Sequence, residues 1–212
     1  GMLPEKSGYK DGKAGFYDIG ATFSHTFNKY HKLNIYGYYS RDRFAFNDNE
    51  KYGYGNMNIS AHWRAIFSER FMANFSAGYD HYDYKNDESA DSIQAARLSF
   101  NIDQYFAKAN FNLTLEKHKL NFGASTMMYN IGAGTYEPLG NLSIVAYDEL
   151  QKDKALESAV YVGEEWEVTP KLSLNAGIRY SMFNAMGPRN YYTYQPGTLP
   201  SESTIADTVR VT

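Results

Sequence analysis

The stretch that decides the fold is residues 156–183, LESAVYVGEEWEVTPKLSLNAGIRYSMF. Its second half alternates between apolar and polar side chains almost without exception. Successive side chains of a strand point to opposite faces, so this half predicts a strand with one apolar and one polar face. The apolar set is Leu172, Leu174, Ala176, Ile178, Tyr180 and Met182, and the polar set is Lys171, Ser173, Asn175, Gly177, Arg179 and Ser181.

A tight turn and a second strand complete a hairpin with this stretch. Proline fixes its own φ and cannot donate to a strand ladder, so Thr169-Pro170-Lys171 predicts a reversal of the chain. The residues before it, 156–168, alternate less strictly because Glu164 interrupts their apolar face. The hairpin of 156–168 and 172–183 is the unit that the rest of the chain repeats.

The same alternation predicts six further long strands and two long loops. Between Ile102 and Tyr105 the apolar residues move from even to odd positions, which predicts one long strand with a β-bulge. The long loops are expected at 131–155, with its glycines and Pro138, and at 184–212. The six strands are expected at residues 16–27, 33–46, 54–67, 71–84, 96–115 and 120–130.

The connections between these strands alternate in length, and this asymmetry favours one fold class. Turns of about three to five residues follow every other strand, and longer polar loops follow the rest. The strands run about 12 residues or more, whereas a membrane-spanning β-strand needs about 9–11. A soluble sandwich has shorter strands and Greek-key crossings. The sequence therefore predicts an all-β, antiparallel up-and-down meander of about eight long strands, which is part of an outer-membrane-type β-barrel or closes into one.

The composition agrees with a barrel of this kind and excludes several other classes of protein. The chain has 20 tyrosines and 13 phenylalanines against 2 tryptophans, and tyrosine suits boundaries between apolar and aqueous zones. The absence of cysteine excludes disulfides and thiolate chemistry. A net charge of −3 gives no case for nucleic acid. The sequence has no apolar run of about 18 residues, so transmembrane helices are not expected.

The sequence shows no arrangement that would support an enzyme or a bound cofactor. The five histidines have no metal-ligand spacing, and Glu164 and Glu165 point to opposite faces of one strand, so they cannot act as a carboxylate pair. A Ser/His/Asp pattern and a phosphate-binding glycine loop are both missing. We therefore expect no catalytic residues, no metal site and no cofactor.

The polar faces of the predicted strands carry the candidate functional residues. In a closed barrel these side chains would line the lumen, whereas in an open sheet they would form only a solvated face. They are His62, Arg64, Asn74, Asn110, Asn112, Asn175 and Arg179.

Two smaller groups also have two interpretations each. Tyr191, Tyr192 and Tyr194 could form an aromatic cluster at an outer mouth that stacks on a sugar or another ligand, or they could simply pack. Arg41 and Arg43 could contact lipopolysaccharide phosphates, or they could be a solvated strand end.

Several stretches resemble the barrel of TonB-dependent outer-membrane receptors. The hairpin with Trp166 followed by LSLNAGIRY resembles a recurrent mid-barrel signature of that family, and the loop GPRNYYTYQPG resembles a branch that carries a carboxypeptidase-regulatory-like N-terminal extension. The similar stretches are AGFYDIGATFSHTFN (14–28), NIYGYYSRDRFAFND (34–48), HKLNFGAS (118–125), YEPLG (136–140) and EEWEVTPKLSLNAGIRYSMFNAMGPRNYYTYQPG (164–197).

The resemblance implies a larger protein than this chain. Family barrels have about 22 strands around an N-terminal plug, so residues 1–212 would be a single segment forming about a third of the wall, with both ends cut from a longer receptor. The implied localisation is the outer membrane of a Gram-negative cell. The implied partners are outer-membrane lipid, a plug domain and TonB, with no nucleic acid.

The implied function is the import of a scarce nutrient such as an iron chelate, a corrinoid or an oligosaccharide, and the sequence does not indicate which. In this interpretation Asn175 and Arg179 face the lumen, Ile178 and Tyr180 face lipid, and the Thr169-Pro170-Lys171 turn lies at the periplasmic rim. Two alternatives remain: a non-transporting outer-membrane adhesin or binding barrel, and a soluble β-rich ligand-binding domain. The isolated chain could close into a small barrel, stay an open sheet or pair its edges with another copy.

Overall fold

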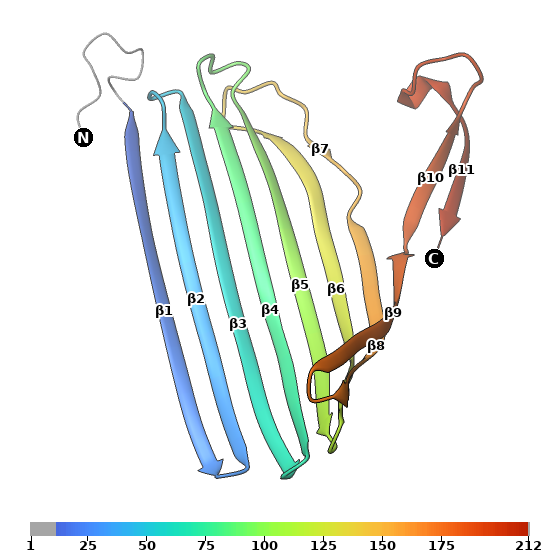
Figure 1. Cartoon of the computed structure of the whole chain (residues 1–212). Coiled ribbons are helices and arrows are strands. Elements are labelled where there is room, and N and C mark those ends of the chain that lie inside the picture. Colours follow the sequence, from blue (N-terminus) through green and yellow to red (C-terminus); the bar gives the residue numbers. More distant parts are fainter. Residues whose placement is uncertain (1–11, 212) are drawn as a thin grey trace.

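A computed structural model describes residues 12–211, which form one long-stranded antiparallel sheet and a small separate hairpin (Figure 1). The order of the long strands in the sheet follows their order in the sequence, and every neighbouring pair is antiparallel. This confirms the predicted all-β up-and-down meander. The strands are β1 (Lys13–Asn28), β2 (His31–Ala45), β3 (Glu50–Ser68), β4 (Phe71–Glu88), β5 (Ala96–Thr114), β6 (His118–Pro138), β7 (Asp148–Glu149), β8 (Asp153–Thr169) and β9 (Leu172–Met186).

The sheet is open within the described residues. Strand β1 pairs with β2 alone and β9 pairs with β8 alone, so these two strands are its edges. The short strand β7 pairs only with the end of β6, where Thr135 lies opposite Glu149. An open sheet of this kind is consistent with part of a barrel whose wall continues beyond it.

Short turns gather at one end of the sheet and longer connections at the other, which are the bottom and top of Figure 1. The first turn is held by Asn28, whose Oδ1 accepts hydrogen bonds from the backbone N–H groups of Tyr30 and His31 at 2.8 and 2.9 Å. Asn47 acts in the same way between β2 and β3. An asparagine that bonds its own backbone two residues on stabilises such reversals. The ends are called the turn end and the loop end below.

The prediction of a loop at 131–155 is wrong over part of that stretch. Strand β6 continues through residue 138, and β8 begins at Asp153. The glycines that suggested a loop lie beside a bulge, because Ser99 pairs with Thr135 while Asn101 pairs with Gly132, which leaves one extra residue in β6. In addition, Gly134 accepts a backbone hydrogen bond from Leu150 at 2.8 Å, so the ladder continues past the bulge.

The bulge predicted within 96–115 is also wrong. Strand β5 pairs with β4 without any shift from Ala96 opposite Glu88 to Leu113 opposite Phe71. The change of phase between Ile102 and Tyr105 therefore marks a change in which face of β5 is apolar. Near the turn end one face is apolar, and near the loop end the opposite face is.

The loop predicted at 184–212 also contains regular structure. Strand β9 extends to Met186, and β10 (Arg189–Tyr194) pairs with β11 (Ile205–Val211) in a separate hairpin that includes the short helix η1 (Glu202–Thr204). The prolines in this stretch lie outside the paired residues, and Gly197 has a φ of +81° that favours glycine. The final residue, 212, lies outside the described part.

The two faces of the sheet differ in chemistry. One row of side chains across the sheet contains Trp63, Phe75, Ala109, Ala124, Val160 and Tyr180, and we call its side the apolar face. The opposite side is the polar face. Within residues 12–211 no second layer covers the apolar face, where Ile178 is 73% exposed and Tyr180 is 66% exposed. Only alanines are buried among the apolar residues described, so the chain has almost no core of its own.

No helix among residues 12–211 has the length and hydrophobicity to cross a membrane.

Candidate functional site

The register places the seven candidate residues of the polar strand positions on one face of the sheet. Arg64 lies opposite Asn74, which lies opposite Asn110 on the next strand. Asn112 lies opposite Asn121 on β6, and this row of paired residues continues across β8 to β9. Asn175 and Arg179 lie on the same side of β9. His62 completes the set, and its Nδ1 lies 2.9 Å from Ser76 Oγ.

The polar face is hollowed near the turn end. A depression of about 680 Å³ is lined by Asn112, Asn121, Tyr161, Asn175 and Arg179 among others. Tyr161 donates a hydrogen bond to Asn110 Oδ1 at 2.6 Å, and the Arg179 guanidinium lies 5.9 Å from the centre of the Tyr161 ring. Amide groups, a tyrosine hydroxyl and a guanidinium therefore line part of this surface, which suits contact with water or a polar partner.

An aromatic group near the loop end of the polar face was missed by the sequence reasoning. Tyr54 lies opposite Tyr84, and the Tyr84 and Phe100 rings are stacked with centroids 4.9 Å apart. Phe44 and Tyr52 continue the group on neighbouring strands, with centroids 5.8 Å apart. The change of phase within β5 was the available signal, because Phe100 is one of the residues on the unexpected face.

The three tyrosines of β10 do not lie on one surface. Tyr192 and Tyr194 share one side of the hairpin, and Tyr191 lies on the other because strand side chains alternate. The Arg189 guanidinium lies over the Tyr191 ring at 5.2 Å and also pairs with Asp153 at 2.9 Å. Arg189 therefore links the hairpin to β8, and Tyr191 packs against this arginine.

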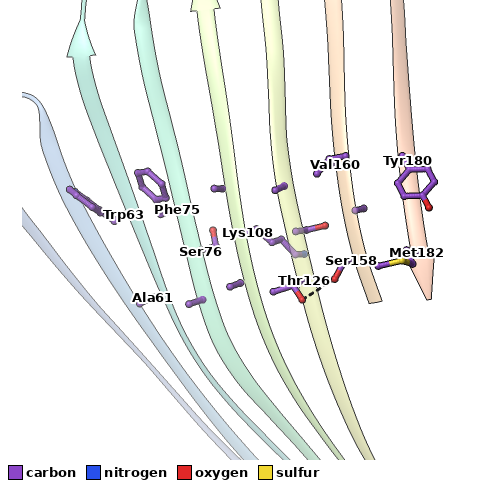
Figure 2. A pocket seen from close by; sticks show the side chains of 16 residues that line it. Ala61, Trp63, Phe75, Ser76, Lys108, Thr126, Ser158, Val160, Tyr180 and Met182 are labelled. Atoms are coloured by element: carbon purple, nitrogen blue, oxygen red, sulfur yellow. Dashed lines mark hydrogen bonds between the residues drawn. The ribbon is translucent and has the colours of Figure 1, made fainter. Parts of the chain in front are cut away.

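The apolar face contains a shallow groove, which Figure 2 shows from close by. It has a volume of about 870 Å³, and small side chains form its floor. Trp63 and Tyr180 flank it on β3 and β9, and the hydroxyls of Thr126 and Ser158 lie 3.4 Å apart inside it. Alanines and large apolar side chains make up most of its lining, so the groove offers mainly apolar contact.

Charged side chains occupy the loop end of the apolar face. Arg41 pairs with Asp83, with Nη1 and Oδ2 2.6 Å apart. Asp87 accepts hydrogen bonds from Arg97 Nε and Nη2 at 2.5 and 2.8 Å, and this guanidinium lowers the pKa of Asp87 below its ordinary value. No group of three or more histidines, aspartates or glutamates in the described part of the chain could hold a metal ion.

Three solved structures share this fold over most of the chain. BauA, the ferric preacinetobactin receptor from Acinetobacter baumannii, matches with a TM-score of 0.59 and 13% identity over 82% of this chain and 34% of its own. Fiu, the ferric-catecholate import receptor from E. coli K12, matches with a TM-score of 0.67 and 9% identity over 97% of this chain and 43% of its own. The copper transporter OprC matches with a TM-score of 0.67 and 8% identity over 82% of this chain and 29% of its own.

The chain therefore spans less than half the length of each of these structures. At such low identity the likeness shows the fold alone. No curated protein is significantly similar in sequence. The family model for the TonB dependent receptor-like β-barrel matches residues 4–207, which is nearly the whole chain. The chain belongs to the β-barrel family of TonB-dependent receptors, which are proteins of the outer membrane.

Proposed function

We propose that residues 1–212 form part of the barrel wall of a TonB-dependent receptor that imports a scarce nutrient. The full-length protein would add the rest of the barrel, a plug and the segment that contacts TonB. The family match supports this assignment, and the three structural neighbours are receptors or transporters by their own descriptions. The wall itself carries no catalytic role in this proposal.

The observation that carries the proposal is the height of the apolar face. On β4 its apolar side chains run from Phe71 to Tyr79, and on β5 from Tyr105 to Leu113. Each run covers nine residues, and a tilted strand needs about 9–11 residues to cross the hydrocarbon core. Beyond Tyr79 the same face becomes charged. We call this set of runs the apolar band, and we place it against lipid.

Aromatic side chains lie at both limits of the apolar band. Tyr17 and Tyr39 have ring centroids 6.0 Å apart at its loop-end limit, and Tyr79 and Tyr105 are 4.9 Å apart there. Toward the turn end lie Trp166, Phe71, Phe111 and Phe122. Aromatic girdles at both water interfaces are typical of outer-membrane barrels, and tyrosine and tryptophan suit these interfaces because each joins an apolar ring to a polar O–H or N–H group.

The polar face then lines the lumen, with the turn end in the periplasm and the loop end outside. The amide-rich hollow around Asn175 and Arg179 would contact the plug. The aromatic group of Tyr54, Tyr84 and Phe100 lies nearer the outer mouth, where cargo would first meet the wall. Flat aromatic rings bind sugar rings, catechol rings and macrocycles alike, so this group supports a ligand site without selecting the nutrient.

Growth on limiting nutrients tests the proposal. The full-length gene is placed in cells that lack their own receptors, with and without TonB. Each strain is then grown with a ferric chelate, a corrinoid or an oligosaccharide as its limiting nutrient. The proposal expects growth on one of these sources only when TonB is present. Surface binding without uptake of any source would contradict it and would favour a non-transporting binding barrel.

A further inference from the structure

A second hollow of the polar face lies level with the loop-end limit of the apolar band, because Asp80 directly follows Tyr79. It has a volume of about 430 Å³. Small-molecule pockets have volumes of about 300–1,000 Å³, so the hollow is large enough for a ligand. Two neighbouring rows of the register form it, and their lining side chains on the polar face include Tyr38, Asn56, Asn58, Asp80, Tyr82 and Gln104.

The side chains of this hollow keep both hydrogen-bond donors and acceptors free. Asp80 Oδ1 accepts a hydrogen bond from Asn58 Nδ2 at 2.5 Å, and no group among residues 12–211 donates to its Oδ2. Asn56 Nδ2 donates to Ser40 Oγ at 3.3 Å, which leaves the Asn56 carbonyl oxygen as an acceptor. The Gln104 amide forms no hydrogen bond within the described part of the chain. A hydroxyl group both donates and accepts, so this mixed set fits a ring that carries several hydroxyls.

The hollow continues into the aromatic group near the loop end. Tyr82 lines the hollow, and its ring centroid lies 5.9 Å from that of Phe100. Phe100 is in turn stacked on Tyr84, which lies two residues farther along β4. The face of an aromatic ring is apolar and carries the negative side of the quadrupole, so it accepts the C–H groups of a sugar ring. Aromatic faces therefore lead from the hollow toward the outer mouth.

The charge of this surface distinguishes among the candidate nutrients. From the row of Asp80 to the loop end, the polar-face positions of the described strands β1 to β5 carry carboxylates and no lysine or arginine. An anionic ferric chelate would meet like charges here and no cation, whereas a neutral ligand avoids this repulsion. The carboxylates are Asp18, Asp42, Glu50, Asp80 and Glu88.

We propose that this hollow binds one ring of a neutral oligosaccharide, and that further rings of the same chain lie on Tyr84 and Phe100 toward the outer mouth. Asp80 and Gln104 would bind hydroxyls of the first ring, and Tyr82 would stack on one of its faces. A hydroxyl that donates to a carboxylate forms a charge-assisted hydrogen bond, so Asp80 is the strongest polar contact of the site. This inference rests on the proposed import function and names the class of its cargo.

Binding of the full-length receptor in detergent to a set of immobilised glycans tests the ligand class. The set contains neutral hexasaccharides of glucose, mannose, galactose and xylose beside hexagalacturonate and a sulfated galactan. Ferric tris-catecholate and cyanocobalamin are titrated separately in solution. We expect at least one neutral chain to bind at least about tenfold more tightly than either anionic chain. Absence of binding to every neutral chain, or tighter binding of an anionic chain, the chelate or cyanocobalamin, would overturn the proposal.

Variants titrated by calorimetry with the neutral chain that binds test the position of the site. Asp80→Ala removes the charged acceptor and Tyr82→Leu removes the stacking ring, so each is expected to weaken binding at least about tenfold. Tyr82→Phe keeps the ring and should stay within about threefold of the wild type. Asp18→Ala is the matched control, because it removes an exposed carboxylate of the same face that does not line the hollow. Its affinity should change by less than about twofold.

Unchanged binding by Asp80→Ala and Tyr82→Leu, or an equal loss in Asp18→Ala, would overturn the assignment of the hollow. The heat-modifiable mobility of each variant in electrophoresis confirms that its barrel has folded. TonB-dependent growth separates this failure from that of the proposed function. Growth on the chelate or the corrinoid without binding of any neutral glycan overturns the sugar site alone. Binding of a neutral glycan at Asp80 and Tyr82 without TonB-dependent uptake overturns the import function and leaves the site.

Discussion

Arg41 and Asp83 form an ion pair across the strand that separates them. Arg41 lies opposite Gly55 on β3, and Gly55 lies opposite Asp83 on β4. Arg41 Nη1 lies 2.7 and 2.6 Å from the two carboxylate oxygens, directly above the glycine. A Cβ at position 55 would collide with both charged groups. The missing side chain therefore allows residues on non-adjacent strands to meet.

Gly55→Ala is expected to destabilise the folded barrel by about 1–3 kcal/mol, because it separates a half-buried charged hydrogen bond and leaves two charges without partners. Equilibrium unfolding in urea measures this change. Gly37→Ala is the matched control, since it lies on the same face of β2 with no atom within 4 Å of an added Cβ. Equal midpoints for the two variants would contradict the expected role of Gly55.

A second contact of this type lies on the polar face. Asn110, Gly123 and Tyr161 are in register on β5, β6 and β8, and the Tyr161 hydroxyl crosses the glycine to reach Asn110. Tyr161→Phe removes this hydrogen bond and is expected to cost about 1 kcal/mol in unfolding free energy. Gly123→Ala is expected to cost more, because its Cβ would also meet the backbone oxygen of Ala109. The reverse order would contradict this arrangement.

Acid should weaken the contribution of Asp87, which lies well beyond the apolar band. The Arg97 guanidinium lowers the pKa of Asp87 below its ordinary value of 3.8. A carboxylate whose pKa is lower in the folded state contributes stability above its unfolded pKa and loses it as pH falls through the folded value. The stability difference between the wild type and Asp87→Asn should therefore stay constant from pH 7 to 5 and shrink below pH 3.8. Equilibrium unfolding of both proteins at several pH values measures this difference. A difference that does not shrink below pH 3.8 would contradict the expected contribution of the Asp87–Arg97 pair.

The hairpin of β10 and β11 should loosen when its link to β8 is removed. Arg189 pairs with Asp153 at 2.9 Å, and both side chains are more than a third exposed. Pairs this exposed contribute at most about 1 kcal/mol, so Arg189→Ala is expected to speed amide exchange in β10 by up to about fivefold. Exchange of the β4 amides serves as the internal control and should not change. An unchanged rate in β10 would show that other contacts hold the hairpin.

Alternation was sufficient to predict the meander because each strand has one apolar and one polar face within the apolar band. Residues 172–183 show this most clearly, since Ile178 and Arg179 lie on opposite faces as their positions in the sequence predict. The side chains of a strand obey this rule wherever one face must avoid water. The prediction of the meander therefore depended on one local property, the alternation of side chains along each strand, which the structure also shows.

The same rule failed where the strands leave the apolar band. Phe100 and Ile102 are apolar on the polar face, so their pattern suggested a bulge where the strand is regular. Glycines 132 and 134 suggested a loop where they accompany a bulge in β6. Outside the band both faces meet a polar environment, so alternation no longer identifies the strand or its register.

The candidate sites depended on pairing as well as on alternation. The face shared by Asn74, Asn110 and Arg179 could be expected from parity along each strand. The contacts of Arg41 with Asp83 and of Tyr161 with Asn110 could not, because they join residues 42 and 51 positions apart through a glycine on a third strand. Only the register of three strands brings such residues together.

Cysteine accessibility at positions 178 and 179 tests the central claim most directly. Single-cysteine variants of the full-length receptor are treated with a water-soluble maleimide in permeabilised outer membranes, and denatured samples confirm that each thiol can react. Position 178 lies on the apolar face and position 179 on the polar face. The account predicts modification of 179 alone, because lipid covers 178 and water fills the lumen. Modification of 178 with protection of 179 would contradict it.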